Sequence, residues 1–237
     1  MSAPPLAGRR AVVTGASRGI GLAIADALAA AGARLTLLAR DARTLEEQAV
    51  RLEARAIPCD VADANAVERA IAAIRDGAEP PDILVNNAGL FRPGTIDATT
   101  PEALTAALDV NLVAPFRLAR GFLPGMLERG RGDIVSIGSI ADHTTFPENG
   151  AYGASKHGLR ALHAVLRAEL RGTGVRVTLI SPGPVDTSLW DEIDPDSREG
   201  FTPRSRMLPA NAVAAAVVYA LAQPRDVDVE LVRLSRA

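Results

Sequence analysis

The chain has 237 residues, of which 48% are hydrophobic, and its formal net charge at pH 7 is −2. Such a balance gives no electrostatic reason to expect nucleic acid or an anionic membrane as a partner. No apolar run reaches the ~18 residues that a membrane-spanning helix needs, and the first ten residues hold no apolar signal core. A single cysteine, Cys59, cannot form an internal disulfide, so we expect a cytoplasmic protein.

Short apolar, β-branched runs alternate with longer amphipathic stretches along the chain. The expected strands are residues 11–14, 34–39, 54–58, 83–86, 133–137, 175–180 and 227–233. The expected helices are residues 19–31, 42–53, 64–76, 101–129, 151–172 and 209–222, the fourth with Thr99 or Thr100 as its N-cap. This alternation predicts one α/β domain over residues 1–237, a doubly wound parallel sheet of about seven strands with helices on both faces. The long irregular stretch at about 184–207 is the expected substrate lid.

A glycine-rich turn follows the first expected strand and opens the first expected helix. It reads Thr14-Gly15-Ala16-Ser17-Arg18-Gly19-Ile20-Gly21. Such glycines let the backbone approach a pyrophosphate, and the helix N-terminus favours the anion. Glycine turns without a ligand are also common, so the turn alone leaves both interpretations open. Its spacing resembles the first turn of the short-chain dehydrogenase/reductase family, which has a Rossmann-type fold, and the resemblance recurs along nearly the whole chain.

The end of the second expected strand bears on the choice between NADP and NAD. Where NAD-dependent Rossmann proteins place an acid for the ribose 2′-hydroxyl, this chain has Ala39 and then Arg40. Arg40 and Arg18 match a 2′-phosphate in charge and geometry, and the family uses basic residues at both places for NADP. Asp41 lies one residue too late for the NAD role but keeps that alternative open, and either arginine could simply be solvated. We expect a preference for NADP(H).

Three later segments resemble further cofactor contacts of the family. Asp60-Val61 resembles its adenine contact, although Asp60 or Asp63 could equally cap the next helix. Asn86-Asn87-Ala88-Gly89 resembles the segment that joins strand ends beside the adenosine ribose. Residues 182–187 resemble the segment that fixes the nicotinamide carboxamide, which implies transfer from the pro-S side. The implied cofactor contacts are Gly15, Ser17, Arg18, Gly19, Ile20, Gly21, Arg40, Asp60, Val61, Asn87, Ala88, Gly89, Tyr152, Lys156, Pro182, Gly183, Val185 and Thr187.

The catalytic candidates centre on the only lysine of the chain. Lys156 lies four residues after Tyr152, so the two side chains share one face of the expected helix. A cation beside the phenol is expected to stabilise phenolate and to lower the tyrosine pKa from about 10. The other 25 basic residues are arginines, which cannot supply the same compact ammonium group. Tyr152 is therefore the expected acid/base.

Two positions complete this constellation by resemblance. Ser139 follows the fifth expected strand and matches the serine that holds the substrate oxygen beside the tyrosine. Asn111 matches the asparagine that helps to place a water linking the lysine to solvent, although a hydrogen-bonded core amide is the alternative. The resemblance thus implies a catalytic tetrad of Asn111, Ser139, Tyr152 and Lys156.

The expected function is NADP(H)-dependent interconversion of a carbonyl and an alcohol, as a ketone or aldehyde reductase or a hydroxy-acid or alcohol dehydrogenase. Alternatives are a non-catalytic NADP-binding sensor and a 3-oxoacyl-carrier-protein reductase. A sugar-nucleotide epimerase or dehydratase is disfavoured by the glycine spacing and the short chain. Residues 228–237 lack the glycine-rich ending common among the acyl reductases. They look more like the subgroup acting on small hydroxy acids, 3-hydroxy amino acids or varied ketones.

The expected partner is a small-molecule carbonyl or alcohol substrate. Residues expected to line its pocket are Leu90, Phe91, His143, Phe146, Asn149, Pro184, Leu189 and Trp190, although His143 is more readily a surface histidine. No cluster of His, Cys and acids has metal-ligand spacing, so no metal is expected. The resemblance also implies a homodimer or homotetramer.

Overall fold

The computed structural model describes residues 3–76 and 80–237, which build a parallel sheet in the order β3-β2-β1-β4-β5-β6-β9. The strands are β1 (Arg10–Thr14), β2 (Arg34–Ala39), β3 (Arg55–Pro58), β4 (Ile83–Asn86), β5 (Gly132–Ile137), β6 (Val175–Pro182) and β9 (Leu231–Leu234). Strand order reverses between β1 and β4, and ligands of such sheets bind beyond the carboxyl ends of the strands at that point. The predicted doubly wound fold is confirmed.

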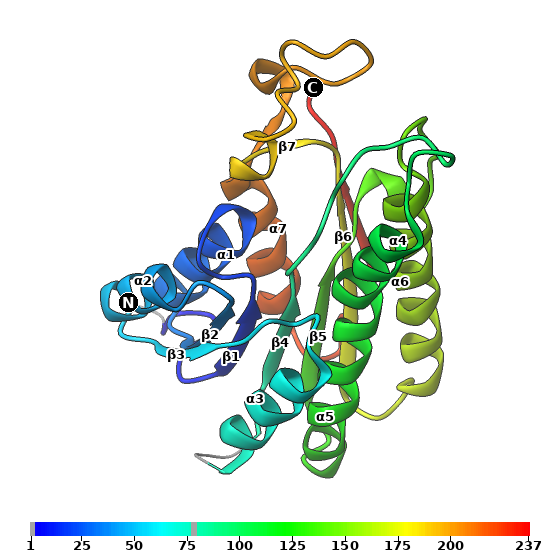
Figure 1. The fold of residues 1–237 in the computed structure, drawn as a ribbon. Helices are drawn as coiled ribbons and strands as arrows, with labels where there is room; N and C mark the ends of the chain where they lie inside the picture. Colours follow the sequence, from blue (N-terminus) through cyan, green and yellow to red (C-terminus); the bar gives the residue numbers. More distant parts are fainter. Residues whose placement is uncertain (1–2, 77–79) are drawn as a thin grey trace.

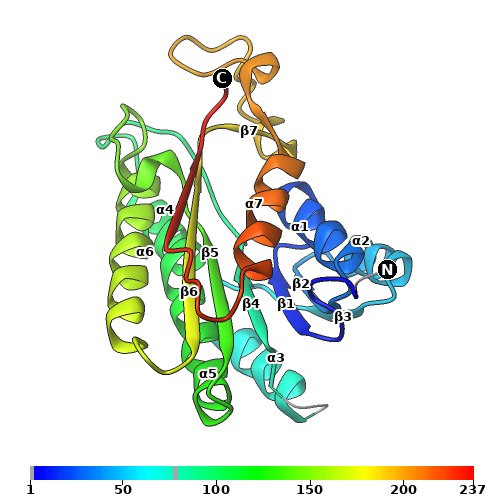
Figure 2. The same ribbon diagram turned by 180° about the vertical axis from the view of Figure 1, so that it is seen from behind.

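Helices cover both faces of the sheet (Figures 1 and 2). One face carries α1 (Gly19–Ala30), α2 (Ala42–Arg51) and α7 (Ala210–Ala222), and the other carries α3 (Ala64–Asp76), α4 (Pro101–Leu108), α5 (Ala114–Glu128) and α6 (Gly150–Glu169). Neighbouring residues of β1 point to opposite faces of the sheet. Val13 packs in the hydrophobic core between the sheet and α1, and Val12 packs in the core between the sheet and α3 and α5. Burial on both faces explains why the strands are apolar without alternation.

The end of the sheet differs from the prediction. The last strand begins at Leu231, not at residue 227, while the other predicted elements have ends within three residues of those observed. The guanidinium of Arg176 donates to the carbonyls of Gln223, Pro224 and Val227 at 2.9–3.1 Å. These bonds hold the segment before Leu231 in a turn instead of the sheet.

The stretch predicted as one helix over residues 101–129 is two α-helices joined by a π-helical turn, Asp109–Val113. Pro115 has no N–H to donate to the carbonyl of Asn111, four residues earlier, so the regular α-helical pattern is interrupted there. At the start of α4, the hydroxyl of Thr100 accepts from the N–H of Ala103 at 3.2 Å, which makes Thr100 the N-cap. The π-helical turn places Asn111 in the interior beside α6.

The segment over residues 184–207 lies above the carboxyl ends of the strands (Figure 1). The segment begins with β7 (Val185–Asp186). This strand pairs in parallel with β8 (Leu208–Pro209), which directly follows the segment. Arg204 connects its two limbs, because its guanidinium binds Asp186 at 2.9 Å and Asp191 at 2.5 Å. The segment is therefore folded back on itself rather than extended.

Candidate active site

A cavity of about 1060 Å³ runs along the carboxyl ends of the strands, from the glycine turn to the segment over residues 184–207. Ligand pockets commonly measure roughly 300–1,000 Å³, so this cavity can hold a dinucleotide and a small substrate. Every cofactor contact expected from the sequence lines it, as do Ser139, Phe146, Asn149 and Trp190. Residues spread over most of the chain thus meet at one place.

The glycine turn has the shape that a pyrophosphate requires. Gly15 and Gly19 have positive φ angles of 66° and 59°, a region that side chains disfavour. A Cβ at Gly21 would lie 2.2 Å from the carbonyl oxygen of Gly15, so only glycine fits there. Because the turn and the N-terminus of α1 line the cavity, they form a cradle that fits the phosphates of a dinucleotide.

Asn87 joins the two strand ends that flank the point of strand reversal. Its Nδ2 donates to the carbonyl of Thr14 at 2.8 Å, and its backbone N–H donates to the Thr14 hydroxyl at 2.9 Å. The backbone N–H of Ala88 donates to the same hydroxyl at 3.0 Å. The expectation that this asparagine knits strand ends together is confirmed.

Arg18 and Arg40 line the end of the cavity next to β2. Neither guanidinium has a hydrogen-bond or ion-pair partner among residues 3–76 and 80–237. Asp41, which kept the NAD alternative open, instead caps α2 by accepting from the N–H and the hydroxyl of Thr44, both at 3.0 Å. These bonds, the backbone one foremost, hold the pKa of Asp41 below its usual value. The basic pair fits a 2′-phosphate, and the carboxylate of Asp41 is already engaged.

The two interpretations of the acid after β3 are separated by the hydrogen bonds. Asp63 caps α3, because its carbonyl accepts from the N–H of Val67 at 3.0 Å and its carboxylate from the N–H of Asn65 at 2.8 Å. Asp60 accepts from the N–H of Ala62 at 3.0 Å and lines the cavity. The capping role therefore belongs to Asp63, which leaves Asp60 at the cavity wall.

Tyr152 and Lys156 lie one turn apart on α6 and face the end of β5. The ammonium Nζ of Lys156 donates to the carbonyl of Ile137 at 2.8 Å and lies 5.7 Å from the centre of the Tyr152 ring. The Lys156 residue is only 4% exposed. Ser139 accepts from the N–H of Ala141 at 3.1 Å and lines the same cavity as Tyr152 and Lys156. The three polar groups expected from the sequence thus converge.

The acid–base properties differ from the sequence expectation. Burial raises the pKa of Tyr152; the hydrogen bond from Ser139 opposes this rise, and the charge of Asp142 adds to it. Burial also lowers the pKa of Lys156 to about 8, against the opposing effect of Asp142. The expected lowering of the tyrosine pKa is wrong here, because desolvation of the phenolate outweighs its stabilisation. Tyr152 is held as a neutral proton donor beside a lysine that is charged at neutral pH.

Asp142 is a site residue that the sequence analysis missed. It is 1% exposed, and its Oδ2 accepts from the hydroxyl of Ser181 and from the N–H of Ser139, the latter at 3.3 Å. Its Oδ1 lies 2.6 Å from Nδ1 of His143. His143 therefore pairs with Asp142 and does not line the cavity, contrary to its expected place in the substrate pocket. The available signal was the spacing Ser-x-x-Asp, which is typical of a capping box.

Asn111 lies behind the cavity wall and orients the catalytic helix. Its amide bonds both backbone groups of Leu90 at 2.8 Å, and its Nδ2 also donates to the hydroxyl of Ser155 at 2.9 Å. Ser155 in turn donates to the carbonyl of Tyr152 at 2.7 Å. The alternative of a hydrogen-bonded core amide is therefore confirmed for its side chain.

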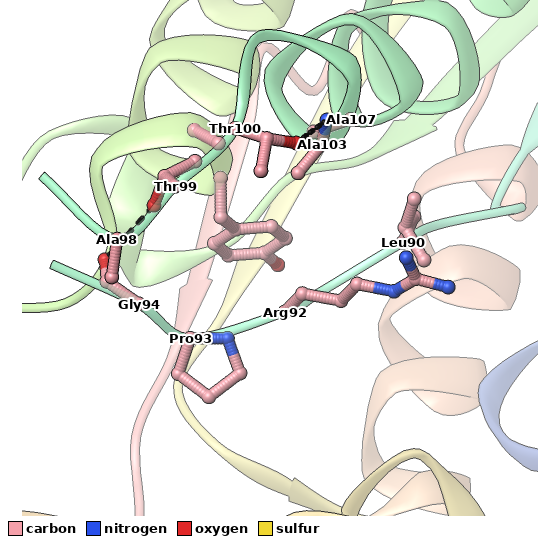
Figure 3. A pocket seen from close by; sticks show the side chains of 11 residues that line it. Leu90, Arg92, Pro93, Gly94, Ala98, Thr99, Thr100, Ala103 and Ala107 are labelled. Atoms are coloured by element: carbon pink, nitrogen blue, oxygen red, sulfur yellow. Dashed lines mark hydrogen bonds between the residues drawn. The ribbon is translucent and has the colours of Figure 1, made fainter. Parts of the chain in front are cut away.

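A second cavity of about 140 Å³ lies between α4, the start of α6 and the segment before α4 (Figure 3). On its rim, the hydroxyl of Thr99 donates to the carbonyl of Thr95 at 2.7 Å and lies 3.4 Å from the carbonyl oxygen of Gly94. Arg92 and Tyr152 both line it, so it adjoins the catalytic tyrosine on the side of α4.

Residues 3–76 and 80–237 contain no group of three or more His, Cys, Asp or Glu side chains placed to hold a metal ion. Among the helices described, none combines the length and apolar character needed to cross a bilayer.

Comparison with known proteins agrees with this geometry. The short chain dehydrogenase family model matches residues 9–198. An uncharacterized oxidoreductase of Staphylococcus epidermidis is 36% identical over 226 residues, which cover 94% of this chain and 95% of that protein. The chain belongs to the short-chain dehydrogenase family and is an oxidoreductase acting on CH–OH groups.

Two other relatives bear on the ligands. A glycine betaine reductase of Emericella nidulans is 37% identical over 231 residues, which cover 94% of this chain but only 18% of that protein. A solved metagenomic short-chain oxidoreductase in complex with NADP is 32% identical, with a TM-score of 0.85 over 98% of this chain and 99% of that one. The chain thus spans less than a fifth of the reductase but nearly the whole of the NADP-bound oxidoreductase.

Proposed function

We propose that this protein interconverts a carbonyl and an alcohol with NADP(H), and that Tyr152 is its acid/base. The observation that carries this proposal is the single cavity shared by the glycine turn, the Arg18–Arg40 pair and the catalytic residues Tyr152 and Lys156. The NADP-bound relative, 32% identical over nearly the whole chain, supports the choice of cofactor.

The bound cofactor supplies or accepts the hydride, and the protein supplies orientation and the proton. During reduction the hydroxyls of Ser139 and Tyr152 donate to the substrate oxygen, and Tyr152 transfers its proton to that oxygen. Its raised pKa keeps the phenol protonated and ready for this step. In the oxidative direction Tyr152 takes the proton back.

Lys156 stabilises the phenolate that this transfer leaves behind. Its ammonium is fixed by the carbonyl of Ile137 at 2.8 Å, so little reorganisation is needed when the charge develops. The side chain of Asn111 is fully engaged by Leu90 and Ser155. Because Pro115 cannot donate to the backbone carbonyl of Asn111, we assign to that carbonyl the placement of a water leading toward Lys156.

The direct test follows the absorbance of NADPH in the presence of aldehydes, ketones and keto acids. We expect carbonyl-dependent oxidation of NADPH by the purified protein. Tight binding of NADPH without turnover of any compound would instead favour a cofactor-binding sensor. The Ser139–Tyr152–Lys156 set argues against that sensor, which needs only the cofactor cradle.

The proposal includes a cytoplasmic homodimer or homotetramer. Phe116 on α5 is 50% exposed, and Val165 on α6 is 53% exposed, so both helices present apolar side chains outward. Association through these helices would cover them. Light scattering coupled to size exclusion should give two or four chains per particle, and a monomer would contradict the proposal.

A further inference from the structure

We propose that the substrate is a neutral carbonyl compound carrying a flat aromatic group, which packs among Phe91, Trp190 and Phe201. This inference rests on the proposed function, since it concerns the substrate of the same site. The chain has five phenylalanines, two tyrosines and one tryptophan. Five of these eight aromatic side chains line the large cavity, namely Phe91, Phe146, Tyr152, Trp190 and Phe201.

Four of the rings form a row that starts at the catalytic tyrosine. The ring centres of Tyr152 and Phe91 are 4.8 Å apart, those of Phe91 and Trp190 are 5.5 Å apart, and those of Trp190 and Phe201 are 6.2 Å apart. The interplanar angles of 63°, 67° and 80° are edge-to-face. A substrate ring near this row gains further edge-to-face contacts while its carbonyl points toward Tyr152.

The walls that carry these rings are tied to one another. The N–H of Gly94, after Phe91, donates to the carbonyl of Glu148 at 2.8 Å. The carboxylate of Glu148 binds Arg198 at 2.6 Å, and the Arg198 guanidinium lies 4.9 Å from the ring centre of Phe201. The aromatic row is therefore held in a preformed pocket.

Trp190 is fixed by its own hydrogen bond. Its indole Nε1 donates to the carbonyl of Val185 at 2.9 Å, so the ring is anchored to β7 with its apolar body free to contact a ligand. Val185 also lines the cavity as an expected cofactor contact. The aromatic wall and the cofactor cradle are thus joined at β7.

The charges at this end of the cavity disfavour an anionic substrate. Within residues 3–76 and 80–237, the basic side chains that line the cavity are Arg18, Arg40 and Lys156, which the cofactor and the proton transfer use. The charged residues lining the aromatic end are Glu148 and Glu199. Arg198 beside Phe201 is already paired with Glu148, so a carboxylate buried there would lose its hydration without gaining a free cation. This conclusion departs from the small hydroxy acids that the end of the sequence favoured.

Arg92 marks the place where an acid could bind instead. It lines the second cavity, which at about 140 Å³ leaves room only for a small group beside Tyr152. The aromatic row lines the larger cavity, and Arg92 does not. Substrate charge and substrate ring size therefore distinguish the two sites.

Four α-keto compounds separate the effect of the aromatic ring from the effect of the negative charge: methyl benzoylformate, benzoylformate, methyl pyruvate and pyruvate. The first pair differs from the second by a phenyl ring, and each ester differs from its acid by a negative charge. We expect the lowest KM for methyl benzoylformate, at least about tenfold below that of methyl pyruvate, because a ring is buried. Benzoylformate should have a KM well above that of its ester. A KM for benzoylformate or pyruvate that equals or lies below the KM of the matching methyl ester would overturn the inference.

Binding of the four compounds can also be measured without turnover by tryptophan fluorescence, because Trp190 is the only tryptophan of the chain. Methyl benzoylformate should change the emission of Trp190 at lower concentration than the other three compounds, measured in protein loaded with NADP⁺, which has no hydride to transfer. If NADPH binds and this ester does not, the substrate inference is wrong while the cofactor assignment stands. If NADPH itself fails to bind, the proposed function fails.

Phe201→Leu keeps an apolar side chain and removes the ring. We expect the KM for methyl benzoylformate to rise about threefold to tenfold, and the KM for methyl pyruvate to rise by a clearly smaller factor. Tyr219→Leu is the matched control, since Tyr219 is 59% exposed on α7 and does not line the cavity. An equal rise in both KM values for Phe201→Leu would indicate a general structural role and contradict the inference.

Discussion

Asp142 and Ser139 are hydrogen-bonded to each other in both directions. The N–H of Ser139 donates to the carboxylate of Asp142 at 3.3 Å, and the N–H of Asp142 donates to the carbonyl of Ser139 at 2.9 Å. The same carboxylate accepts from Ser181 at the end of β6, so it joins two strand ends beneath the catalytic groups. Asp142 is therefore a positioning residue, and its buried charge also acts on Lys156.

Replacing Asp142 by asparagine should lower the pKa of Lys156 below its value of about 8, because the carboxylate favours the charged ammonium. Lysine-labelled protein carries a single side-chain Nζ signal, which nuclear magnetic resonance can follow through a pH titration. Ser181→Ala is the control, since it removes a hydrogen bond to Asp142 and leaves the charge in place. A lysine pKa unchanged by Asp142→Asn would show that Asp142 has no electrostatic role.

The rate of carbonyl reduction should fall as the pH rises through about 8. Lys156 loses its proton there, while the raised pKa of Tyr152 keeps the phenol protonated. We expect kcat/KM for the carbonyl to be flat between about pH 6 and 7 and to decline with a midpoint near 8. In Asp142→Asn the midpoint should move to lower pH. A profile that stays level beyond pH 9 would contradict the role given to the ammonium.

Arg40→Ala should weaken the binding of NADPH about tenfold to a hundredfold, as expected when a charge-assisted hydrogen bond is lost. Binding of NADH, which lacks the 2′-phosphate, should change little. Arg43→Ala is the matched control, because Arg43 lies three residues on and pairs with Glu47 outside the cavity. Equal losses for the two cofactors in Arg40→Ala would argue against recognition of the 2′-phosphate.

The sequence predicted what depends on local spacing. The glycine turn is fixed by its own φ angles, and Tyr152 and Lys156 share a helix face because they are four residues apart. The partnership of Asp142 with Ser181 crosses 39 residues, and that of Asn111 with Ser155 crosses 44, so no local pattern reveals either.

The pKa direction of Tyr152 was missed for a different reason. The sequence shows the neighbouring cation but not the degree of burial, and burial is the largest cause of the raised pKa of Tyr152. The aromatic row escaped notice because its members come from separate segments, at Phe91, Tyr152, Trp190 and Phe201. These four aromatic residues are far apart in the sequence, and only the tertiary structure brings their rings together.

His163 should make the protein less stable in mild acid. Burial, aided by the charge of Arg167, lowers its pKa to about 4, whereas the unfolded chain has the ordinary value of 6.5. Between pH 6.5 and about 4, the His163 side chain is therefore protonated in the unfolded chain and neutral in the folded protein. The free energy of unfolding should therefore fall by about 2 kcal/mol between pH 7 and 5.

The variant His163→Leu should flatten this pH dependence in urea unfolding. His157→Gln is its control, because His157 lies on the same helix but is exposed. The explanation fails if the difference in unfolding free energy between pH 7 and 5 is the same in His163→Leu and the unmodified protein.

The Tyr152→Phe variant tests the central claim most directly, because it removes one hydroxyl and keeps the ring that packs against Phe91. NADPH binding and carbonyl-dependent NADPH oxidation should be measured side by side in this variant and the unmodified protein. We predict unchanged NADPH affinity and a loss of kcat/KM of about a hundredfold to ten-thousandfold, the usual contribution of a positioned acid/base. Retention of most of the turnover would contradict the assignment of Tyr152 as the proton donor.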